Sequence, residues 1–269
     1  MDIELNGTLI TSSTNTYPYR AILDTFLSYG EDAKKTQLTS ALYNKDDAAR
    51  MDTVTVDADA NEKNNGLIQR ALFTCGSRVV DMIGRLHADI FFQDRYMLNE
   101  VTAKIRLVRS KNAFCIMSDN DRKVTITNAM MLVRKVKLSP SVFLAHAKAL
   151  ENGMAKYPIR RVVCKTFTVP ANFMDVSHEK LFSGQLPTRI VVGLVRNDAF
   201  NGDRRRNPFN FQHFNVSEMS LYLDGQQSGI KPMELNYNNR HYIRAYNTLF
   251  SEPERSARTK GSASTEATT

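Results

Sequence analysis

Apolar and polar side chains alternate with a period of two residues through the middle of the chain. The clearest case is the segment 101–107, in which Val101, Ala103, Ile105 and Leu107 are separated by polar residues. Residues two apart lie on the same face of a strand, so such a segment buries one face and exposes the other. The same reasoning predicts further strands at residues 1–10, 79–92, 114–117, 123–137, 159–169 and 189–195.

Helical spacing is confined to a few segments. Residues 20–29 carry apolar side chains three and four positions apart and end at Gly30, and a shorter helix is expected at residues 36–43. Ser139 followed by Pro140 is typical of a helix start, and Gly153 closes the helix predicted at 139–152. Many short strands with few helices indicate an all-β sandwich or barrel with helical excursions.

One phrase of the sequence occurs twice, at residues 3–28 and again at 221–251. Each copy reads as alternating apolar residues, a turn pair, a polar loop, and an apolar run that begins with Arg-Ala and ends in Ser. The pattern fits either an internal duplication or chance, since the loops differ in length. If it is a duplication, two fused jelly-roll sandwiches are the leading architecture. The turn pairs favour positive φ, and they are Asn6-Gly7 and Asp224-Gly225.

Composition narrows the class of protein. The chain has 269 residues, 42% of them apolar, and a formal net charge of +8. A basic balance raises the prospect of an anionic partner such as nucleic acid. Three widely spaced cysteines, with no metal-ligand spacing, indicate a reduced intracellular setting. No stretch is long and apolar enough for a membrane span, and the Ser/Thr/Ala/Gly-rich tail at 251–269 is expected to be disordered.

Catalytic and ligand-binding motifs fail when tested position by position. Asp57, Asp59 and Asn61 have the opening spacing of a calcium loop, but the required glycine and closing glutamate are absent. His87 and Asp89 are two residues apart in a predicted strand and so lie on the same face. They fit either a histidine packed in the core or an acid/base pair, but no nucleophile or substrate-binding group accompanies them. We therefore expect no enzymatic activity, cofactor, metal or small-molecule substrate.

A basic run near the end of the chain leaves two interpretations open. Arg204, Arg205 and Arg206 are followed closely by Phe209 and Phe211. Arginines interleaved with aromatic rings are typical of surfaces that bind single-stranded nucleic acid, where bases stack on the rings. The same residues are also typical of a solvated face or of a contact between subunits.

Several ordered stretches, covering about Asp2 to Phe250, resemble one family. They are residues 16–20 with 28–34, 81–87 with 104–110, 133–140 with 143–149, and 184–187 with 207–211. These stretches are similar to the capsid-type proteins of Polinton/Maverick DNA elements and adintovirus-like viruses. The resemblance implies a virion structural protein, a major or a minor capsid protein, of the double jelly-roll class. In that class two fused sandwiches form a subunit and three subunits form a capsomer.

Mapped onto this chain, the resemblance divides it into incomplete halves. Residues 1–150 correspond to the late part of a first jelly roll, with a long loop at 31–66 and a bridging helix at 139–152, and residues 151–250 to the early part of a second. Family members have further strands before Ile3 and after Phe250, so we expect a copy truncated at both ends, with open sheet edges.

The sequence thus predicts a capsid structural protein that acts through contacts between subunits. Its expected partner is itself, as a homotrimer and a capsid lattice, located in the cytoplasm, the nucleus or a virion. The alternative is a basic β module that binds nucleic acid weakly.

Overall fold

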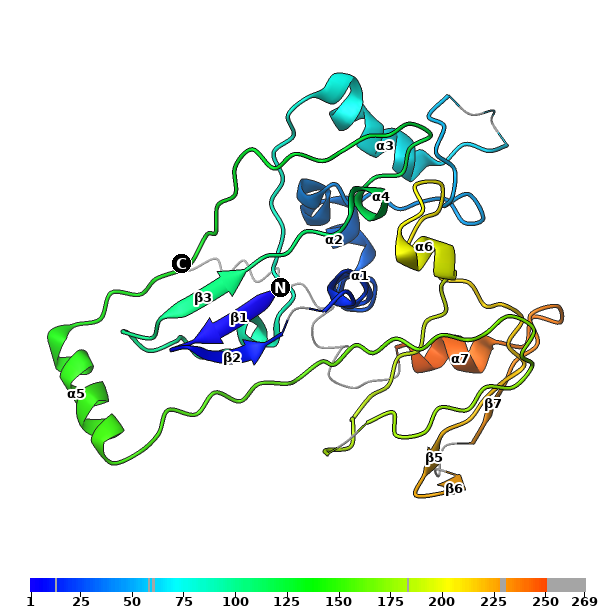
Figure 1. Ribbon diagram of the computed structural model, residues 1–269. Helices are drawn as coiled ribbons and strands as arrows, with labels where there is room; N and C mark the ends of the chain where they lie inside the picture. The colour runs from blue at the N-terminus through cyan, green and yellow to red at the C-terminus, as the bar shows by residue number, and fades with distance from the viewer. Residues whose placement is uncertain (13, 58, 60, 183, 228–230, 251–269) are drawn as a thin grey trace, which may run out of the picture.

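The computed structural model describes residues 1–250 except 13, 58, 60, 183 and 228–230. Helices alternate with short strands and long extended segments (Figure 1). The α-helices are α1 (Tyr17–Ser28), α2 (Glu31–Lys35), α3 (Asn65–Thr74), α4 (Asn112–Cys115), α5 (Pro140–Glu151), α6 (Asn197–Asn201) and α7 (Ile243–Thr248). Three 3-10 helices are η1 (Gln37–Ala41), η2 (Cys75–Ser77) and η3 (Asp89–Phe92). The strands are β1 (Asp2–Leu5), β2 (Thr8–Thr11), β3 (Ala103–Arg106), β4 (Glu218–Met219), β5 (Tyr222–Leu223), β6 (Gln226–Gln227) and β7 (Met233–Glu234).

The largest sheet has β1 at its centre, paired antiparallel with β2 on one side and β3 on the other. Asn6 and Gly7 join β1 to β2 with φ values of 49° and 79°. Two successive residues at positive φ give a tight hairpin whose twist matches that of the strands. The Asn6 side chain also accepts a hydrogen bond of 2.9 Å from the Thr102 amide, which fixes the turn against the start of β3.

A second hairpin lies at the other copy of the repeated phrase. Asp224 and Gly225, with φ values of 51° and 77°, connect β5 to β6. The next strand, β7, pairs antiparallel with β4, and α7 follows. Both copies of the phrase therefore fold as a tight hairpin followed along the chain by a helix that contains the Arg-Ala pair in its first half.

The apolar core is small and lies under the three-stranded sheet. Met1, Ile3, Ala88 and Ile90 form it, and partly buried apolar side chains surround them. Those side chains include Leu5, Tyr17, Leu86, Phe91, Ile105 and Ile159. Ile3 is among the most deeply buried residues because β1 is flanked on both sides by a paired strand.

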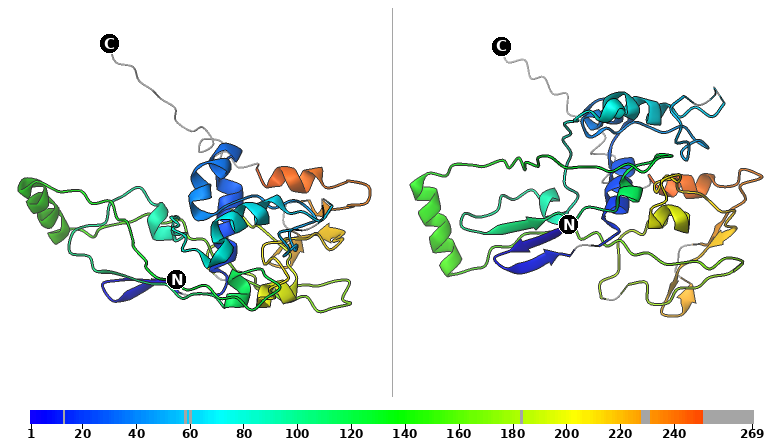
Figure 2. Two further views of the ribbon diagram at one scale, coloured as in Figure 1. Left: turned by 90° about the horizontal axis from the view of Figure 1, so that it is seen from above. Right: turned by 45° about the horizontal axis from the view of Figure 1, so that its top comes forward.

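Much of the chain stays outside any core. In Figures 1 and 2 the segment 122–157, which we call the arm, leaves the rest of the described chain, carries α5 at its far end and returns. Outside α5 the arm is extended chain, and nearly all of its residues are exposed.

The prediction of an all-β jelly-roll fold, single or double, is wrong. Strands hold 9% of the residues and helices 27%, and the sheets are small and separate. Of the predicted strands, 1–10 and 101–107 supply β1, β2 and β3. The described parts of 123–137, 159–169 and 189–195 have no strand partner, and 89–92 and 114–117 overlap η3 and α4.

The cause of this error is physical. Period-two alternation reports that a segment is extended and has one apolar face, but a sheet also requires a neighbour to accept its backbone hydrogen bonds. The alternating segments 123–137, 159–169 and 189–195 are extended in this fold, but no described strand pairs with them. Helices α3 and α6 were not expected either, whereas α1 and α5 lie where helical spacing and the Ser-Pro start predict helices. The tail prediction, 251–269, falls outside the described residues.

Candidate functional site

The first candidate is the basic run, and each of its three arginines faces an aspartate. Arg204 forms an ion pair with Asp121 and donates hydrogen bonds to two carbonyl oxygens of the same turn, at 2.8 and 3.1 Å. The Arg205 Nε atom lies 3.4 Å from a carboxylate oxygen of Asp119. The run therefore fastens the turn that follows α4, and its charge is balanced locally.

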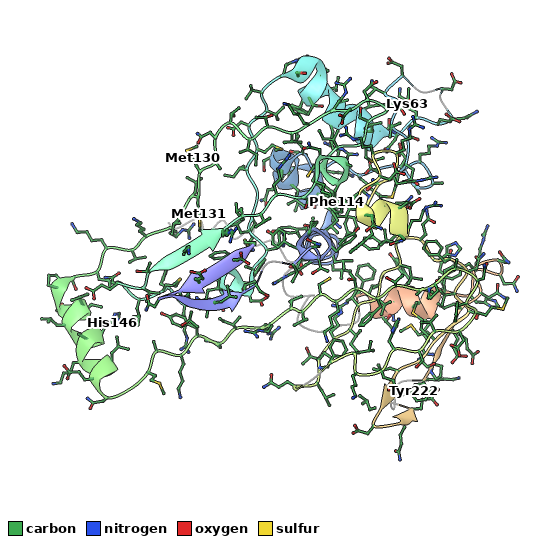
Figure 3. The ribbon with its side chains drawn as sticks, in the orientation of Figure 1. Lys63, Phe114, Met130, Met131, His146 and Tyr222 are labelled. Atoms are coloured by element: carbon green, nitrogen blue, oxygen red, sulfur yellow. The ribbon has the colours of Figure 1, made fainter. Side chains whose placement is uncertain are left out.

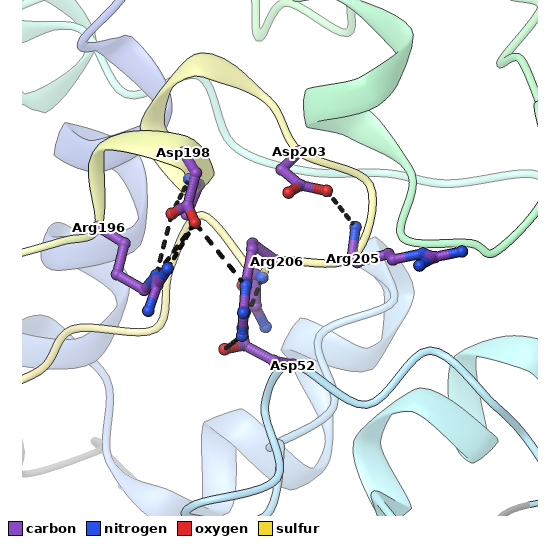
Figure 4. A network of polar contacts seen from close by, with 8 residues as sticks. Asp52, Arg196, Asp198, Asp203, Arg205 and Arg206 are labelled. Atoms are coloured by element: carbon purple, nitrogen blue, oxygen red, sulfur yellow. Dashed lines mark hydrogen bonds and ion pairs between the residues drawn. The ribbon is translucent and has the colours of Figure 1, made fainter.

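Arg206 belongs to a wider polar network, drawn in Figure 4. Its guanidinium lies 3.3 Å from Asp52 and 3.8 Å from Asp198. Asp198 in turn accepts three hydrogen bonds from Arg196, one of 3.0 Å to Oδ1 and two of 2.7 and 3.2 Å to Oδ2. The hydrogen bond from Arg196, helped by the Ala199 amide, lowers the pKa of Asp198 to about 2. This network ties the start of α6 to the long loop at 31–66.

The two phenylalanines of the candidate site pack inward. Phe209 and Phe211 approach Tyr19 edge to face, with ring centroids 5.8 and 6.3 Å away. Phe200 stacks on Tyr19 at 5.5 Å, and Phe114 meets it edge-on at 6.1 Å. Such geometries are the favoured ones for aromatic pairs. We call this group of five rings the aromatic cluster; it joins α1, α4 and α6, and its member Phe114 is labelled in Figure 3.

Tyr19 is the buried centre of the cluster, with 5% of its surface exposed. Its hydroxyl is buried and has no hydrogen-bond partner among the described residues. Burial raises the pKa of Tyr19 to about 12. Phe209 and Phe211 are half-buried, and their rings take part in packing inside this fold.

Gly193 lies against the ring of Phe211, a member of the aromatic cluster. A Cβ atom at Gly193 would lie 2.9 and 3.0 Å from two carbons of the Phe211 ring, closer than side chains normally approach. The glycine thus accommodates the ring against the extended segment 189–195.

His87 does not form the acid/base pair with Asp89 that the sequence left open. The Nδ1 atom of His87 lies 3.3 Å from Asp24, a residue of α1. Asp89 instead forms an ion pair with Arg20, and both side chains of that pair are about nine-tenths buried. The same Asp89 oxygen accepts a hydrogen bond of 3.3 Å from the Val162 amide. These contacts hold α1 to η3 and to the segment that follows the arm.

Within the residues that the structure describes there is no group of three or more His, Cys, Asp or Glu placed to hold a metal ion. No described helix has both the length and the apolar character required to cross a bilayer.

The feature that sequence reasoning missed is the arm. Residues 122–157 hold seven basic side chains and one acidic one, a net charge of +6 within a total of +8. The basic residues are Arg122, Lys123, Arg134, Lys135, Lys137, Lys148 and Lys156. None of the seven forms an ion pair with a described carboxylate, in contrast to the Arg204–Arg206 run. The arm can be found in the sequence when net charge is counted segment by segment instead of over the whole chain.

The arm is also strongly apolar. Twelve of its large apolar side chains are more than a third exposed, and Met130 and Met154 are 82% and 86% exposed. Met130, Met131 and His146 are labelled in Figure 3, where they project from the arm into open space. From Thr125 to Leu138 no residue makes a hydrogen bond to another described residue. The arm therefore presents apolar side chains, positive charge and unpaired backbone together.

Comparison with known proteins adds one relative. An uncharacterised protein of Caenorhabditis elegans is 25% identical over 249 residues, which cover 91% of this chain. The chain spans 56% of the length of that relative. No protein-family model and no solved structure matches the chain.

Proposed function

We propose that this chain is a structural, non-enzymatic subunit of a capsid-like assembly, and that it works through contacts with other subunits. The observation that carries the proposal is the uncovered apolar surface. Forty large apolar side chains are more than a third exposed among the described residues. Monomeric proteins rarely expose continuous apolar surface on this scale, whereas subunits that associate do.

The sequence resemblance supports the same proposal from an independent direction. The stretches at 16–34, 81–110, 133–149 and 184–211 are similar to capsid-type proteins, whose role is structural. The role of the basic run in the fold agrees with it. Arg204, Arg205 and Arg206 are used inside the fold, so they favour a scaffold over a nucleic-acid surface.

The test is the state of association of the full chain. Purified protein, treated with nuclease, is examined by sedimentation velocity over a wide concentration range, and the larger species are viewed by negative-stain electron microscopy. We expect discrete oligomers that grow with concentration. A folded monomer that persists at the highest concentration refutes the proposal.

A further inference from the structure

The arm, residues 122–157, requires a partner that supplies both apolar surface and negative charge. Burial of its twelve exposed apolar side chains corresponds to an area on the order of 1,000 Å², which is what one side of a standard protein interface contributes. Its seven basic side chains lack acidic partners within the described residues.

Nucleic acid fits only half of that requirement. Phosphates neutralise Lys and Arg side chains, but the aliphatic residues of the arm stay in water in such a complex. Single-stranded nucleic acid binds on aromatic side chains, and the arm holds only Phe143 and Tyr157. A protein surface meets both needs.

A second copy of this chain offers that surface, but not through its own arm. Two arms of +6 each repel one another when they meet face to face. The long loop at 31–66 has the opposite sign, with eight acidic and five basic residues. Within it Asp57, Asp59 and Glu62 are exposed and form no ion pair with any described residue.

The arm and the acidic loop lie far apart on the molecule. In both views of Figure 2 the arm ends at α5 on one side, and the loop that leads into α3 lies away from it. Lys63, labelled in Figure 3, marks this loop, and His146 marks the end of the arm. An arm placed in this way reaches the loop of a neighbour more readily than its own.

We infer that the arm of one copy docks on the acidic loop region of a second copy, in a head-to-tail contact. The inference rests on the proposed assembly function and adds the residues and the orientation of the contact. A contact between two different surfaces repeats from copy to copy, so it closes into a ring or continues as an open chain. A two-fold dimer built on two facing arms is excluded by the same charges.

Charge reversal in the arm is the first test. The variant Arg134→Glu, Lys135→Glu and Lys137→Glu is compared with the wild type by sedimentation velocity after nuclease treatment. We expect its association to weaken by about tenfold or more, and wild-type association to weaken in high salt, because opposite charges steer and hold the contact. Circular dichroism of both proteins verifies that the helix content is retained.

A matched control carries the same change in net charge outside the arm. Lys180→Glu, Lys231→Glu and Arg240→Glu reverse three exposed basic residues. Association of this control is expected to stay within about twofold of the wild type, since exposed charges distant from a contact contribute little. Equal weakening in the control and in the arm variant overturns the inference.

Charge exchange tests the orientation. The variant Asp57→Lys, Asp59→Lys and Glu62→Lys is expected to associate poorly alone. Mixed in equal amounts with the arm variant, it restores mixed oligomers in native mass spectrometry, because the three positions made acidic in one arm then meet the three positions made basic in the loop of the other variant. Failure of the mixture to associate, while each variant is folded, overturns the head-to-tail contact.

The two proposals fail in different ways. A monomeric wild-type protein refutes the assembly function and the arm contact together. A wild-type oligomer that the arm reversal leaves intact refutes the arm contact alone. An oligomer that dissociates when nuclease is added identifies nucleic acid as the occupant of the arm, and it also refutes the contact with a second copy.

Discussion

The buried ion pair between Arg20 and Asp89 gives the sharpest test of the fold. Replacing Asp89 with Ala leaves the guanidinium of Arg20 charged and about nine-tenths buried, with only 9% of its side chain exposed. Removing one partner of such a pair typically costs about 3–5 kcal/mol of unfolding free energy. The lost hydrogen bond from the Val162 amide adds to this cost.

The double replacement is expected to cost far less. Arg20→Met with Asp89→Leu removes both charges and fills the space with apolar side chains. The Nε atom of Arg20 has no hydrogen-bond partner among the described residues, so part of its desolvation is uncompensated in the native fold. Apolar replacement of a buried pair is often neutral or stabilising for that reason. We expect the double variant to recover most of the stability lost in Asp89→Ala.

Urea unfolding followed by circular dichroism at 222 nm measures both effects. The exposed pair between Glu31 and Lys35, 2.8 Å apart with side chains 75% and 71% exposed, provides the control. Glu31→Ala is expected to leave the urea midpoint nearly unchanged, because exposed ion pairs contribute little to stability. The reasoning is refuted if Asp89→Ala unfolds at the same urea concentration as the control, or if the double variant is no more stable than Asp89→Ala.

Three further predictions concern the aromatic cluster and its surroundings. Gly193→Ala is expected to lower the stability by about 1–3 kcal/mol, because the new methyl group overlaps the ring of Phe211; an unchanged thermal midpoint contradicts the packing. Tyr19→Phe is expected to be neutral or stabilising by up to about 1 kcal/mol, since it removes a buried hydroxyl without a partner, and a large loss in urea unfolding would reveal a partner. The depressed pKa of Asp198, about 2 against an ordinary 3.8, stabilises the fold above the ordinary value and the effect disappears as the pH falls through both values. The pair with Arg196 is about 40% exposed, so its contribution to stability is small, and Asp198→Asn is expected to remove that small part of the acid dependence in urea midpoints measured at pH 5 and pH 2.5.

Local features of the fold follow from local sequence. Asn6-Gly7 and Asp224-Gly225 adopt positive φ, since an asparagine or aspartate followed by glycine tolerates that region. Pro140 occupies the first position of α5, where its missing amide hydrogen costs nothing. Turns and helix starts of this kind depend only on adjacent residues, so the sequence alone is enough to predict them.

Contacts between distant residues were beyond the reach of this reasoning. Arg204 and Asp121 are 83 positions apart, and Arg206 and Asp52 are 154 apart. An arginine run in the sequence therefore appears unpaired until the fold brings aspartates from two other segments to it. The aromatic cluster has the same origin, because Tyr19 and Phe209 belong to segments at opposite ends of the chain.

The error in fold class and the proposed function have one physical origin. Alternating segments such as 123–137 are encoded as strands with an apolar face, yet the described part of the chain offers them no neighbour. A strand without a neighbour is an edge, and unpaired edges recruit other chains. A partner that covers the arm must also carry negative charge. The net charge of +6 on the arm repels a basic surface, and it repels a second arm in a two-fold contact. The pattern that misled the prediction of the fold thus identifies the surface on which we propose that assembly depends, and the sign of its charge is the reason that we infer a head-to-tail contact.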